Sequence, residues 1–434
     1  MTKPSLQALS AQYGNQDALT VQAAQNILEH FIEPIAEMET IALKDALGRV
    51  IAEDIVSPIN VPPHDNSAMD GFAFHSSVLE NDIAITLSVM GTRLAGHTEQ
   101  ISLGSRECLR IMTGASMPLD CDTVVPQEWS ELVRDDEGRI THVRFESKKL
   151  KAGDNRRRAG EDLALGQTIV SRGTRLQAAD MGLLASVGIA HIRSFRPLRI
   201  AYFSTGDELR SIGEPLDAGC IYDSNRYTLC SLLRAMDVEV IDLGVIRDHP
   251  QNLKETLTQA CQTADAIITS GGVSMGAADF TKQVMQEMGE VAFWSLEMRP
   301  GRPMAVGRIV SNSRQAYLFG LPGNPVAAML NFLFLTRPAL QRLQGQTPKV
   351  PSLLPAIAAH NIRKRPGRTE YQRCLVQLDA QGRLIATTTG AQGSGILRSM
   401  VEADAILVLD EACGDVAAGD LVYLHLLHGL FSNA

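Results

Sequence analysis

Polar and glycine-rich segments follow several predicted strands in the middle third of the chain. Two neighbouring carboxylates, Asp207 and Glu208, come directly after one strand, and Asp248 follows a later one. The glycine-rich segment 269–276 precedes Asp279. Glycines let backbone N–H groups approach a phosphate closely, and Mg²⁺ is usually held by one or two carboxylates together with phosphate oxygens. These segments therefore predict a site for a phosphate group and a magnesium ion.

Other residues of these loops are candidates for contacts with a substrate. They are Asp207, Ser224, Asn225, Ser270, Gly271, Gly272, Ser274, Pro322 and Asn324. A single glycine-rich loop is more often a tight turn than a phosphate site, and Asp207 with Glu208 could equally interact with a helix dipole. Because such loops occur at successive strand ends of one predicted sheet, we favour a functional cleft at this edge.

A second group of residues is basic. Arg299 and Arg302 lie in one Pro/Gly turn, and guanidinium groups bind oxyanions through paired hydrogen bonds. Residues 361–373 contain one acidic side chain, Glu370, and the basic side chains Arg363, Lys364, Arg365, Arg368 and Arg373. A solvent-exposed loop explains each of these basic residues singly. Together they indicate binding of an anion.

The composition limits the classes of function. The 434 residues are 45% hydrophobic and 21% charged, as in ordinary globular proteins, which excludes a mainly disordered chain. A net charge of −9 argues against a protein that coats nucleic acid or an anionic membrane. The N-terminus has no apolar signal segment, and the seven cysteines form no C-x-x-C pair. We therefore expect a cytoplasmic protein with reduced thiols, no membrane span and no nucleic-acid partner.

The elements that must position the candidate residues alternate between strand and helix. A helical pattern covers residues 20–35, with Thr20 as N-cap. Further along, strands are predicted at 199–204, 238–243, 266–269, 292–298, 304–310 and 316–319, and helices at 225–236, 251–261, 279–288 and from Pro325. This alternation predicts a doubly wound, mainly parallel sheet that binds ligands at the carboxyl ends of its strands.

We expect an α/β multidomain chain with four domains, although length alone suggests about three. They are a discontinuous, elongated linking domain (1–60 plus 146–196), a β-rich second domain (61–145), a central α/β domain (197–345) and a small C-terminal all-β, barrel-like domain (346–434). Motifs typical of kinases, α/β-hydrolases and Rossmann dehydrogenases do not occur in the required context.

Six motifs together resemble those of a known family. They are the segments 63–73, 110–115, 160–162, 204–209, 270–276 and 320–325. Their order is that of the molybdopterin molybdenumtransferases, which include bacterial MoeA and the E domain of gephyrin. The similarity runs from about residue 20 to the C-terminus, and the D-N-S-A-M-D-G and S-G-G-V-S-x-G motifs are long enough to be specific.

The resemblance implies a magnesium-dependent enzyme of molybdenum cofactor biosynthesis. Such enzymes take adenylylated molybdopterin and molybdate, insert the metal at the dithiolene sulfurs and release AMP. The resemblance also implies a homodimer in which the central domain of one subunit and the second domain of the other form the cleft. Further implied partners are a molybdopterin adenylyltransferase and the molybdoenzymes that receive the product.

The resemblance assigns roles to particular residues. The carboxylates for Mg²⁺ and catalysis would be Glu208, Asp248 and Asp279. The second-domain side of the cleft would consist of Asp65 and Thr113, both catalytic, with Asn66, Ser67 and Asp70 binding substrate. The molybdate region would consist of Arg299, Arg302, Pro303, Arg373 and Ser394.

The chain departs from the family pattern in the molybdate region. Many members have lysines where Arg299 and Arg302 stand, and a further lysine where Ser295 stands. Ala327 replaces a serine that is common in the family. Charge is therefore kept at the first two positions and lost at the third.

Two alternatives to a molybdenum transferase remain open. One is a molybdopterin-binding scaffold without catalysis. The other is an adenylyltransferase-like or nucleotide-hydrolase activity of the central domain, which resembles a module shared with such proteins. The D-N-S-A-M-D-G motif and the β-rich terminal domain argue against the second alternative.

Overall fold

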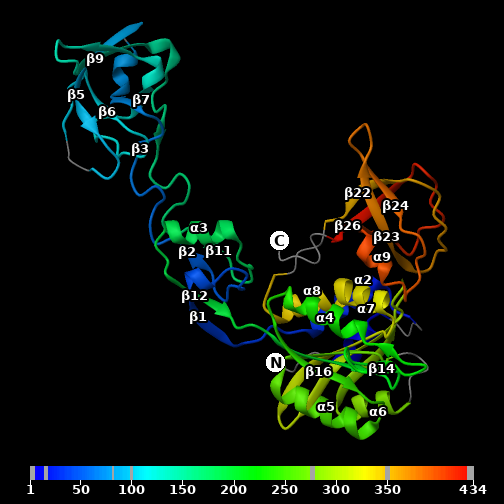
Figure 1. Ribbon diagram of the computed structural model, residues 1–434. Helices are drawn as coiled ribbons and strands as arrows, with labels where there is room; N and C mark the ends of the chain where they lie inside the picture. Colours follow the sequence, from blue (N-terminus) through cyan, green and yellow to red (C-terminus); the bar gives the residue numbers. More distant parts are fainter. Residues whose placement is uncertain are drawn as a thin grey trace.

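The computed structural model describes residues 5–13, 18–80, 83–97, 101–273, 279–347 and 352–427, with the backbone alone at Asp279. The molecule is elongated (Figure 1). A β-rich part forms one end, a thin linking part follows, and the wide end holds a central sheet and the C-terminal strands. In the described part of the chain, no helix is long and apolar enough to cross a membrane.

The central sheet has six strands and lies in the wide end. Their order is β16 (Glu239–Ile246), β13 (Arg199–Thr205), β17 (Ala266–Ser270), β21 (Arg314–Leu321), β20 (Pro303–Ser311) and β18 (Gly289–Ser295). The first four are parallel neighbours, whereas β20 and β18 pair antiparallel. The prediction of a mainly parallel sheet is confirmed. Ser204, Ser270 and Leu321 align in register at its carboxyl edge.

Helices cover both faces of this sheet (Figure 1). One face carries α5 (Pro250–Thr263) and α6 (Asp279–Glu287). The other carries α2 (Val21–Phe31), α4 (Ser224–Arg234), α7 (Pro325–Asn331), the π-helix η5 (Phe332–Thr336) and α8 (Arg337–Leu343). Side chains alternate along β13, so Tyr202 and Phe203 enter the buried clusters on opposite faces. The doubly wound arrangement predicted from the sequence is therefore confirmed.

Helix α2 begins where its sequence pattern predicts and ends earlier. The Thr20 hydroxyl accepts a hydrogen bond from Ala23 N–H at 3.1 Å, which caps the helix. The helix ends at Phe31, and Ile32 is already extended, so the predicted extension to residue 35 is wrong. Pro34 explains this early end, because the residue before a proline disfavours helical geometry.

The thin linking part is built from two passes of the chain. Strand β1 (Met38–Ala42) pairs with β12 (His191–Phe195), and β2 (Ile55–Val56) pairs with β11 (Thr168–Val170). Helix α3 (Ala178–Ser186) packs on them around a small buried cluster that contains Ile51 and Leu184. Segments about 150 residues apart in the sequence thus lie side by side, although the predicted domain boundaries themselves stay a prediction.

The β-rich end contains a second six-stranded sheet. Its order is β7 (Thr123–Pro126), β4 (Gly71–Phe74), β6 (Glu107–Ile111), β5 (Ala84–Arg93), β9 (Ile140–Glu146) and β8 (Glu131–Arg134). Aromatic residues such as Phe72, Phe74 and Phe145 fill its core. The strands β3 (Asn66–Ser67) and β10 (Arg156–Arg157) pair beside this sheet, at its end nearer the linking part.

The C-terminal strands close into a five-stranded barrel, as predicted. They are β22 (Leu354–Ala358), β23 (Thr369–Leu378), β24 (Leu384–Thr388), β25 (Ala405–Leu409) and β26 (Leu421–Leu426). The short strand β19 (Met298–Arg299) of the central part pairs with β23. This pairing brings the turn that contains Arg299 against the barrel.

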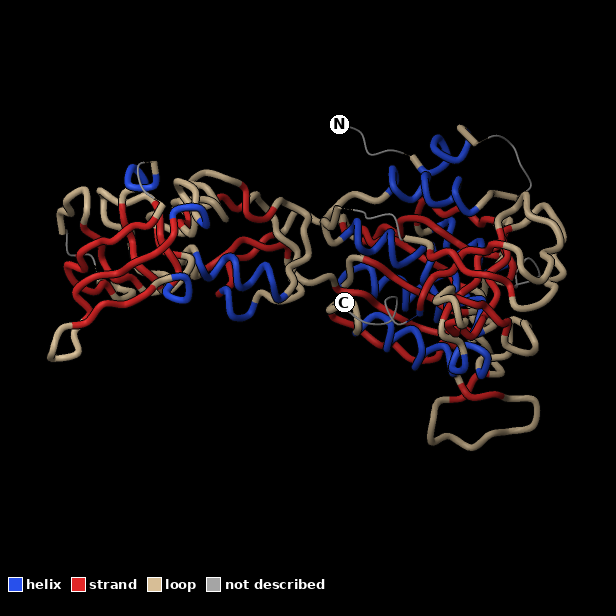
Figure 2. Tube along the Cα trace, turned by 90° about the horizontal axis from the view of Figure 1, so that it is seen from above, coloured by secondary structure: helices blue, strands red, loops and turns tan. Residues whose placement is uncertain are grey.

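The remaining elements are short. They are α1 (Leu6–Ala11), α9 (Arg398–Glu402), β14 (Leu209–Arg210), β15 (Ile221–Tyr222) and the 3-10 helices η1 (Leu43–Asp45), η2 (Ser76–Leu79), η3 (Gln127–Trp129) and η4 (Ser147–Lys149). Strands β14 and β15 pair in parallel and carry a loop, residues 211–220, that projects from the wide end (Figure 2).

Candidate functional site

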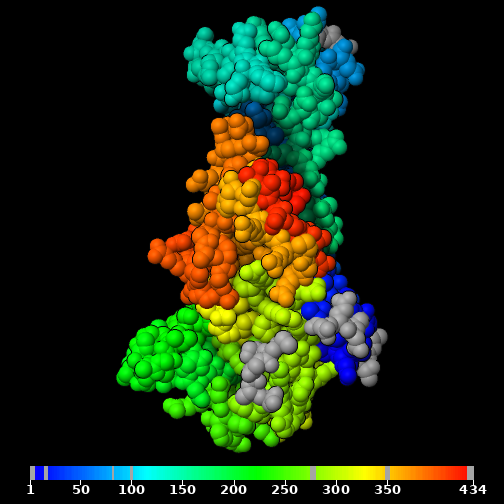
Figure 3. Space-filling model, turned by 90° about the vertical axis from the view of Figure 1, so that its right-hand side faces the viewer, coloured from blue at the N-terminus to red at the C-terminus, as the bar shows by residue number. Residues whose placement is uncertain are grey.

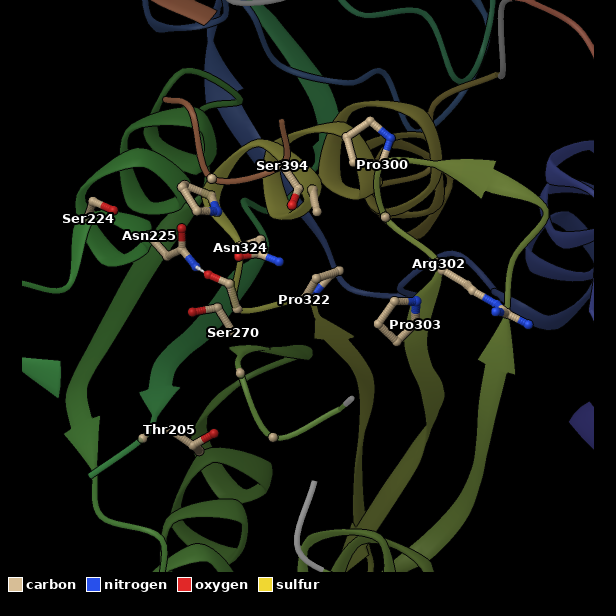
Figure 4. A pocket seen from close by; sticks show the side chains of 18 of the residues that line it. Thr205, Ser224, Asn225, Ser270, Pro300, Arg302, Pro303, Pro322, Asn324 and Ser394 are labelled. Atoms are coloured by element: carbon tan, nitrogen blue, oxygen red, sulfur yellow. Dashed lines mark hydrogen bonds between the residues drawn. The ribbon is translucent and has the colours of Figure 1, made fainter. Parts of the chain in front are cut away.

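A cavity of about 1140 Å³ opens at the carboxyl edge of the central sheet. We call it the central cavity. It is lined by the loops after β13, β17 and β21, by the turn 299–303, and by barrel residues 392–395. Figure 4 shows Thr205 and Ser224 on one side and Arg302 on the other. The cleft predicted at this edge is therefore present, and the barrel closes one of its walls.

Two of the predicted carboxylates line the cavity. They are Glu208 and Asp248, while the neighbouring Asp207 accepts a hydrogen bond from Asp248 N–H at 3.2 Å. The pKa of Asp248 is raised, first by burial and then by the negative charges of Asp207 and Glu208. Among described residues, no three His, Cys, Asp or Glu side chains are close enough to hold a metal without other ligands. The Asp279 side chain lies outside the described residues.

The glycines after β17 are required for close packing of two strand-end loops. Gly271 and Gly272 adopt φ values of +89° and +68°, which favour glycine. A Cβ on Gly271 would lie 2.4 Å from the Thr205 carbonyl oxygen, and one on Gly272 would lie 2.8 Å from Thr205 Oγ1. Gly271 N–H donates to Leu321 O and is therefore not free to bind phosphate. The next predicted contact, Ser274, lies outside the described residues.

A buried cluster of hydroxyl groups supports the loop after β17. Tyr202 Oη lies 2.8 Å from Ser204 Oγ and 3.0 Å from Ser270 Oγ, and all three residues are buried. Burial raises the pKa of Tyr202, so its hydroxyl stays protonated. Tyr202 is not among the predicted site residues, because the sequence pattern of an apolar strand predicts only that its tyrosine belongs to the core. The cluster fixes Ser270, which lines the cavity.

The start of helix α4 forms another wall. The carboxylate of Asp223 caps the helix by accepting a hydrogen bond from Arg226 N–H at 3.0 Å. Ser224 and Asn225 line the cavity, and the Asn225 side-chain amide donates to Gly323 O at 2.8 Å (Figure 4). Pro322 and Asn324 line it beside this bond. The residues predicted to contact the substrate at the start of α4 and in the loop after β21 therefore line the same cavity, and the Asn225 hydrogen bond connects these two segments.

The basic side of the cavity contains three arginines. Arg299, Arg302, Pro303 and Ser394 line it, together with Arg368 from the basic segment. Arg299 is 72% exposed and lies 3.5 Å from Glu370 Oε1. Arg302 Nε donates to Ser295 Oγ at 2.8 Å. The serine that replaces a family lysine therefore orients an arginine.

Arg373 does not line the central cavity. It is fully buried, and its guanidinium group donates to Ser399 Oγ at 3.0 Å and to Gly393 O at 3.1 Å. Burial lowers its pKa to about 10, which leaves it charged at neutral pH. It borders a smaller adjoining cavity of about 390 Å³, together with Arg299 and Gln392. In this structure Arg373 supports the loop that carries Ser394.

Asp65, Asp70 and Thr113 of the β-rich end bond to one another or to nearby backbone, whereas buried Asn66 Oδ1 has no hydrogen-bond partner among the described residues. Asp70 Oδ1 accepts hydrogen bonds from Thr113 N–H and Thr113 Oγ1, both at 2.7 Å. These bonds, the backbone one first, lower the pKa of Asp70. Asp65 accepts from Ala159 N–H at 2.8 Å. Asn66 and Ser67 form β3.

None of these β-rich-end residues lines the central cavity of the same chain. Strand β3 lies toward the opposite end of the molecule from β14 (Figure 1). A single chain therefore does not bring the two predicted halves of the site together.

Three family matches cover most of the chain. Residues 19–188 match the MoeA N-terminal region (domain I and II), residues 201–342 a probable molybdopterin binding domain, and residues 355–427 the MoeA C-terminal region (domain IV). The central cavity lies between the second and third of these regions.

Relatives of known name are similar over nearly the full length. The chain is 41% identical over 411 residues to the molybdopterin molybdenumtransferase of Haemophilus influenzae, covering 94% of this chain and 98% of that protein. It is 31% identical to the enzyme of the same name from a Nostoc species, covering 94% of both chains. Gephyrin of Dictyostelium discoideum is 30% identical, with 92% of this chain covering 61% of that protein.

Solved structures agree with the fold. Two structures of the molybdopterin biosynthesis MoeA protein of Pyrococcus horikoshii superpose with TM-scores of 0.78 and 0.73 at 25% and 30% identity. They cover 94% and 96% of this chain, respectively, and all of the matched chain. With its cavity between the molybdopterin-binding and C-terminal regions, the chain belongs to the molybdopterin molybdenumtransferases, enzymes of molybdenum cofactor biosynthesis.

Proposed function

We propose that the central cavity binds adenylylated molybdopterin and molybdate, transfers molybdenum to the dithiolene sulfurs and releases AMP. One observation carries this proposal: the carboxylates Glu208 and Asp248 and the arginines Arg299 and Arg302 all line a single large cavity. A metal-assisted phosphate site and an oxyanion site are the chemistry that such a reaction needs side by side. Binding both reactants in one cavity would also lower the entropic cost of bringing them together.

The carboxylate side fits Mg²⁺. Glu208 and Asp248 would hold the ion, and phosphate oxygens and waters would supply the remaining ligands, since Mg²⁺ needs only one or two carboxylates. Burial first, and then the negative charges of Asp207 and Glu208, raise the pKa of Asp248, and a bound cation would relieve the repulsion among these three carboxylates. When bound, Mg²⁺ would draw charge from the phosphoanhydride as AMP leaves. Asp279 begins α6 beside this side of the cavity and is proposed as a further carboxylate.

The arginine side fits molybdate. Arg299 and Arg302 would supply hydrogen-bond donors to the oxyanion, and Pro303 and Ser394 would complete its surroundings. Arg373 would act through the loop that it supports, because its guanidinium group is already bonded to Ser399 and Gly393. These residues would hold the oxyanion where the dithiolene sulfurs arrive.

We further propose a homodimer in which the β-rich end of a second copy completes the cavity. The residues that it would supply are Asp65, Asn66, Ser67, Asp70 and Thr113. Their separation from the cavity of their own chain supports this arrangement. We also propose a cytoplasmic location, in keeping with seven free cysteines. A molybdopterin adenylyltransferase and recipient molybdoenzymes are the partners we propose on either side of the reaction.

A direct assay tests this function. The purified protein is mixed with adenylylated molybdopterin, Mg²⁺ and molybdate, and both AMP release and active cofactor are measured. We expect AMP release that depends on molybdate. Tight binding of the substrate without molybdate-dependent AMP release would instead support a scaffold that does not catalyse.

The carboxylate side is tested by Asp279→Asn. We expect turnover to fall by about 100-fold or more, because one negative ligand of the proposed metal site is lost, while circular dichroism stays unchanged. Asp237→Asn, two residues beyond the C-cap of α4 and outside the cavity lining, is the matched control. Normal turnover of Asp279→Asn would remove this residue from the site.

A further inference from the structure

We propose that Asn331 is a positioning residue for molybdate, because its side chain holds the turn 299–303 that carries Arg299 and Arg302. This inference rests on the proposed function and adds a residue that does not itself touch the ligand. Asn331 is the last residue of α7 and is absent from the lining of the central cavity. Its burial and its contacts with the turn are the observations that identify it.

Asn331 is a polar residue in apolar surroundings. Among residues 326–335 it has the only polar side chain. All ten of these residues are buried, and Asn331 itself has no exposed surface. Burying an amide costs free energy unless its donors and acceptors are used. Packing alone would be served better by an apolar side chain, so the amide needs another explanation.

The amide of Asn331 contacts the turn at two points. Its Nδ2 donates to Pro303 O at 3.3 Å. Its Oδ1 faces Gly301, which has a φ of +112° and at which a Cβ would lie 2.2 Å from this oxygen. A residue other than glycine would therefore collide with Asn331 at this position. The two contacts together fix the distance between α7 and the turn.

The turn depends on donors from outside itself. Pro300 and Pro303 have no N–H group, so they cannot donate backbone hydrogen bonds within it. Leu296 N–H donates to Arg302 O at 2.7 Å, and the Asn331 amide donates to the next carbonyl. Two successive carbonyls of the turn are thus held from different sides.

The turn lies where the central part meets the barrel. Strand β19, which ends at Arg299, pairs with β23 of the barrel. Figure 3 shows yellow atoms, from the sequence region of α7, directly below the orange barrel. The backbone of the turn therefore has a fixed neighbour on the barrel side and, through Asn331, on the α7 side.

A fixed backbone matters here because the two arginines are long and exposed. The side chain of Arg299 is 72% exposed, and Arg302 is exposed as well. The backbone positions of these residues decide where their guanidinium groups can meet. A turn that is already held presents both groups at a set spacing, which lowers the cost of ordering them around an oxyanion.

Equilibrium dialysis of the full chain against molybdate, with molybdenum measured by mass spectrometry, tests this inference. Asn331→Leu keeps the shape of the side chain and suits its apolar surroundings, but it removes the donor to Pro303 O. We expect molybdate binding to weaken about tenfold, the upper range for one hydrogen bond. In the AMP-release assay, the KM for molybdate should rise by the same factor, while the KM for adenylylated molybdopterin stays within about twofold.

Thr336→Val is the matched control for Asn331→Leu. Thr336 is equally buried, lies in η5, and has an Oγ1 without a hydrogen-bond partner among the described residues. Removing this hydroxyl changes the same helical run without touching the turn. Thr336→Val should therefore bind molybdate normally.

Gly301→Ala tests the second contact. The added Cβ would press on Asn331 Oδ1, so we expect molybdate binding to weaken about tenfold or more. Asn331→Ala removes this oxygen, and adding it to Gly301→Ala should recover part of the binding. Two independent defects would instead add their losses. If Asn331→Leu does not fold, this pair of alanine variants decides alone.

Three results would overturn the positioning role. They are unchanged molybdate binding by Asn331→Leu, equal rises of both KM values in that variant, and additive losses in the double alanine variant. Each of these leaves the proposed function standing. Failure of the unchanged protein to bind molybdate would contradict the proposed function, and this inference with it.

Discussion

Asp248 in the central cavity and Asp70 in the β-rich end are both predicted site carboxylates, but their surroundings differ. Burial and the neighbouring charges of Asp207 and Glu208 raise the pKa of Asp248. Hydrogen bonds from Thr113 lower the pKa of Asp70. One carboxylate therefore has repulsion that a cation would relieve, while the other is already stabilised within its own chain.

Unpaired polar atoms occur in both regions. In the cavity wall, buried Thr205 Oγ1 and Asp223 Oδ2 have no hydrogen-bond partner among the described residues. At the β-rich end, Asp65, Asp70 and Thr113 bond to one another's segments or to nearby backbone, while buried Asn66 Oδ1 has no partner among the described residues. The contrast between the two regions therefore concerns Asp248 and Asp70 themselves, and Asn66 keeps an acceptor that is not used within its own chain.

The largest expected effect comes from mixing two inactive variants. Asp248→Ala removes a cavity carboxylate, and Asp70→Ala removes one from the β-rich end; we expect each alone to lose about 100-fold or more in turnover. If each site uses both chains, mixed dimers contain one intact site. After the subunits exchange, the mixture should then recover about a quarter of normal turnover, since half of the dimers are mixed.

Two results would contradict a site that is shared between two chains. Activity of the mixture no higher than that of either variant would place both residues in one chain's site or outside catalysis. The control is a mixture of each variant with itself, carried through the same exchange. A monomer in solution would also contradict the shared site, because a second copy would then be absent.

An intermediate effect is expected from adding a methyl group to a glycine in each region. In Gly271→Ala the new Cβ would lie 2.4 Å from Thr205 O, whereas around Gly114 no atom lies within 4 Å of such a Cβ. Both glycines have positive φ, +89° and +79°. We expect Gly271→Ala to destabilise its region by about 2 kcal/mol or more and Gly114→Ala by about 1 kcal/mol.

The thermal transitions of the central and β-rich domains are followed separately, because a chain with several cores does not unfold in a single two-state step. About 2 kcal/mol corresponds to a fall of roughly 4–8 °C for a domain of this size. About 1 kcal/mol in the smaller β-rich domain also corresponds to a fall of roughly 4–8 °C, so each shift is converted to a free energy with the unfolding entropy of its own domain before the two are compared. Equal free-energy losses for the two variants would show that the loop after β17 is no more tightly packed than the turn after Thr113.

The sequence predicts the central region better than the β-rich end for physical reasons. Parallel strands with helices between them have strong periodic sequence patterns. Because the carboxyl ends of such strands meet at one edge of the sheet, the sequence predicts that the loops with Glu208, Asp248 and Ser270 lie close together. The predicted strand at 292–298 is displaced, because β18 ends at Ser295 and a turn closed by Leu296 N–H and Arg302 O follows.

What the sequence could not predict depends on packing. Arg373 belongs to a basic segment, yet its side chain is buried and supports a loop. Tyr202 reads as an apolar core residue, yet it holds Ser270 in place. The roles of Arg373 and Tyr202 depend on the direction in which each side chain leaves its strand and on the residues that it contacts. The short pairs β2–β11 and β3–β10 are too short to produce an alternating pattern.

The smallest expected effect is at Asp70. Thr113→Ala removes the hydroxyl donor and keeps the backbone N–H, which is the larger cause of the lowered pKa. The pKa of Asp70 should therefore rise and still remain below its ordinary value. A lowered pKa stabilises the fold above the unfolded-state pKa, and this contribution is lost as the pH falls through the folded-state pKa. In Thr113→Ala this contribution should be smaller, and its loss should be complete at a higher pH.

Carbon NMR of aspartate carboxyl groups, with the Asp70 signal assigned by its absence in Asp70→Asn, measures this pKa. The control is Thr141→Ala in the same sheet, where the lost hydroxyl donates to Val133 O instead of a carboxylate. An unchanged pKa in Thr113→Ala would mean that the backbone alone holds Asp70. Asp70 would still accept the backbone hydrogen bond within its own chain. The Thr113 hydroxyl would then be free to donate to a ligand in the cavity of a second copy.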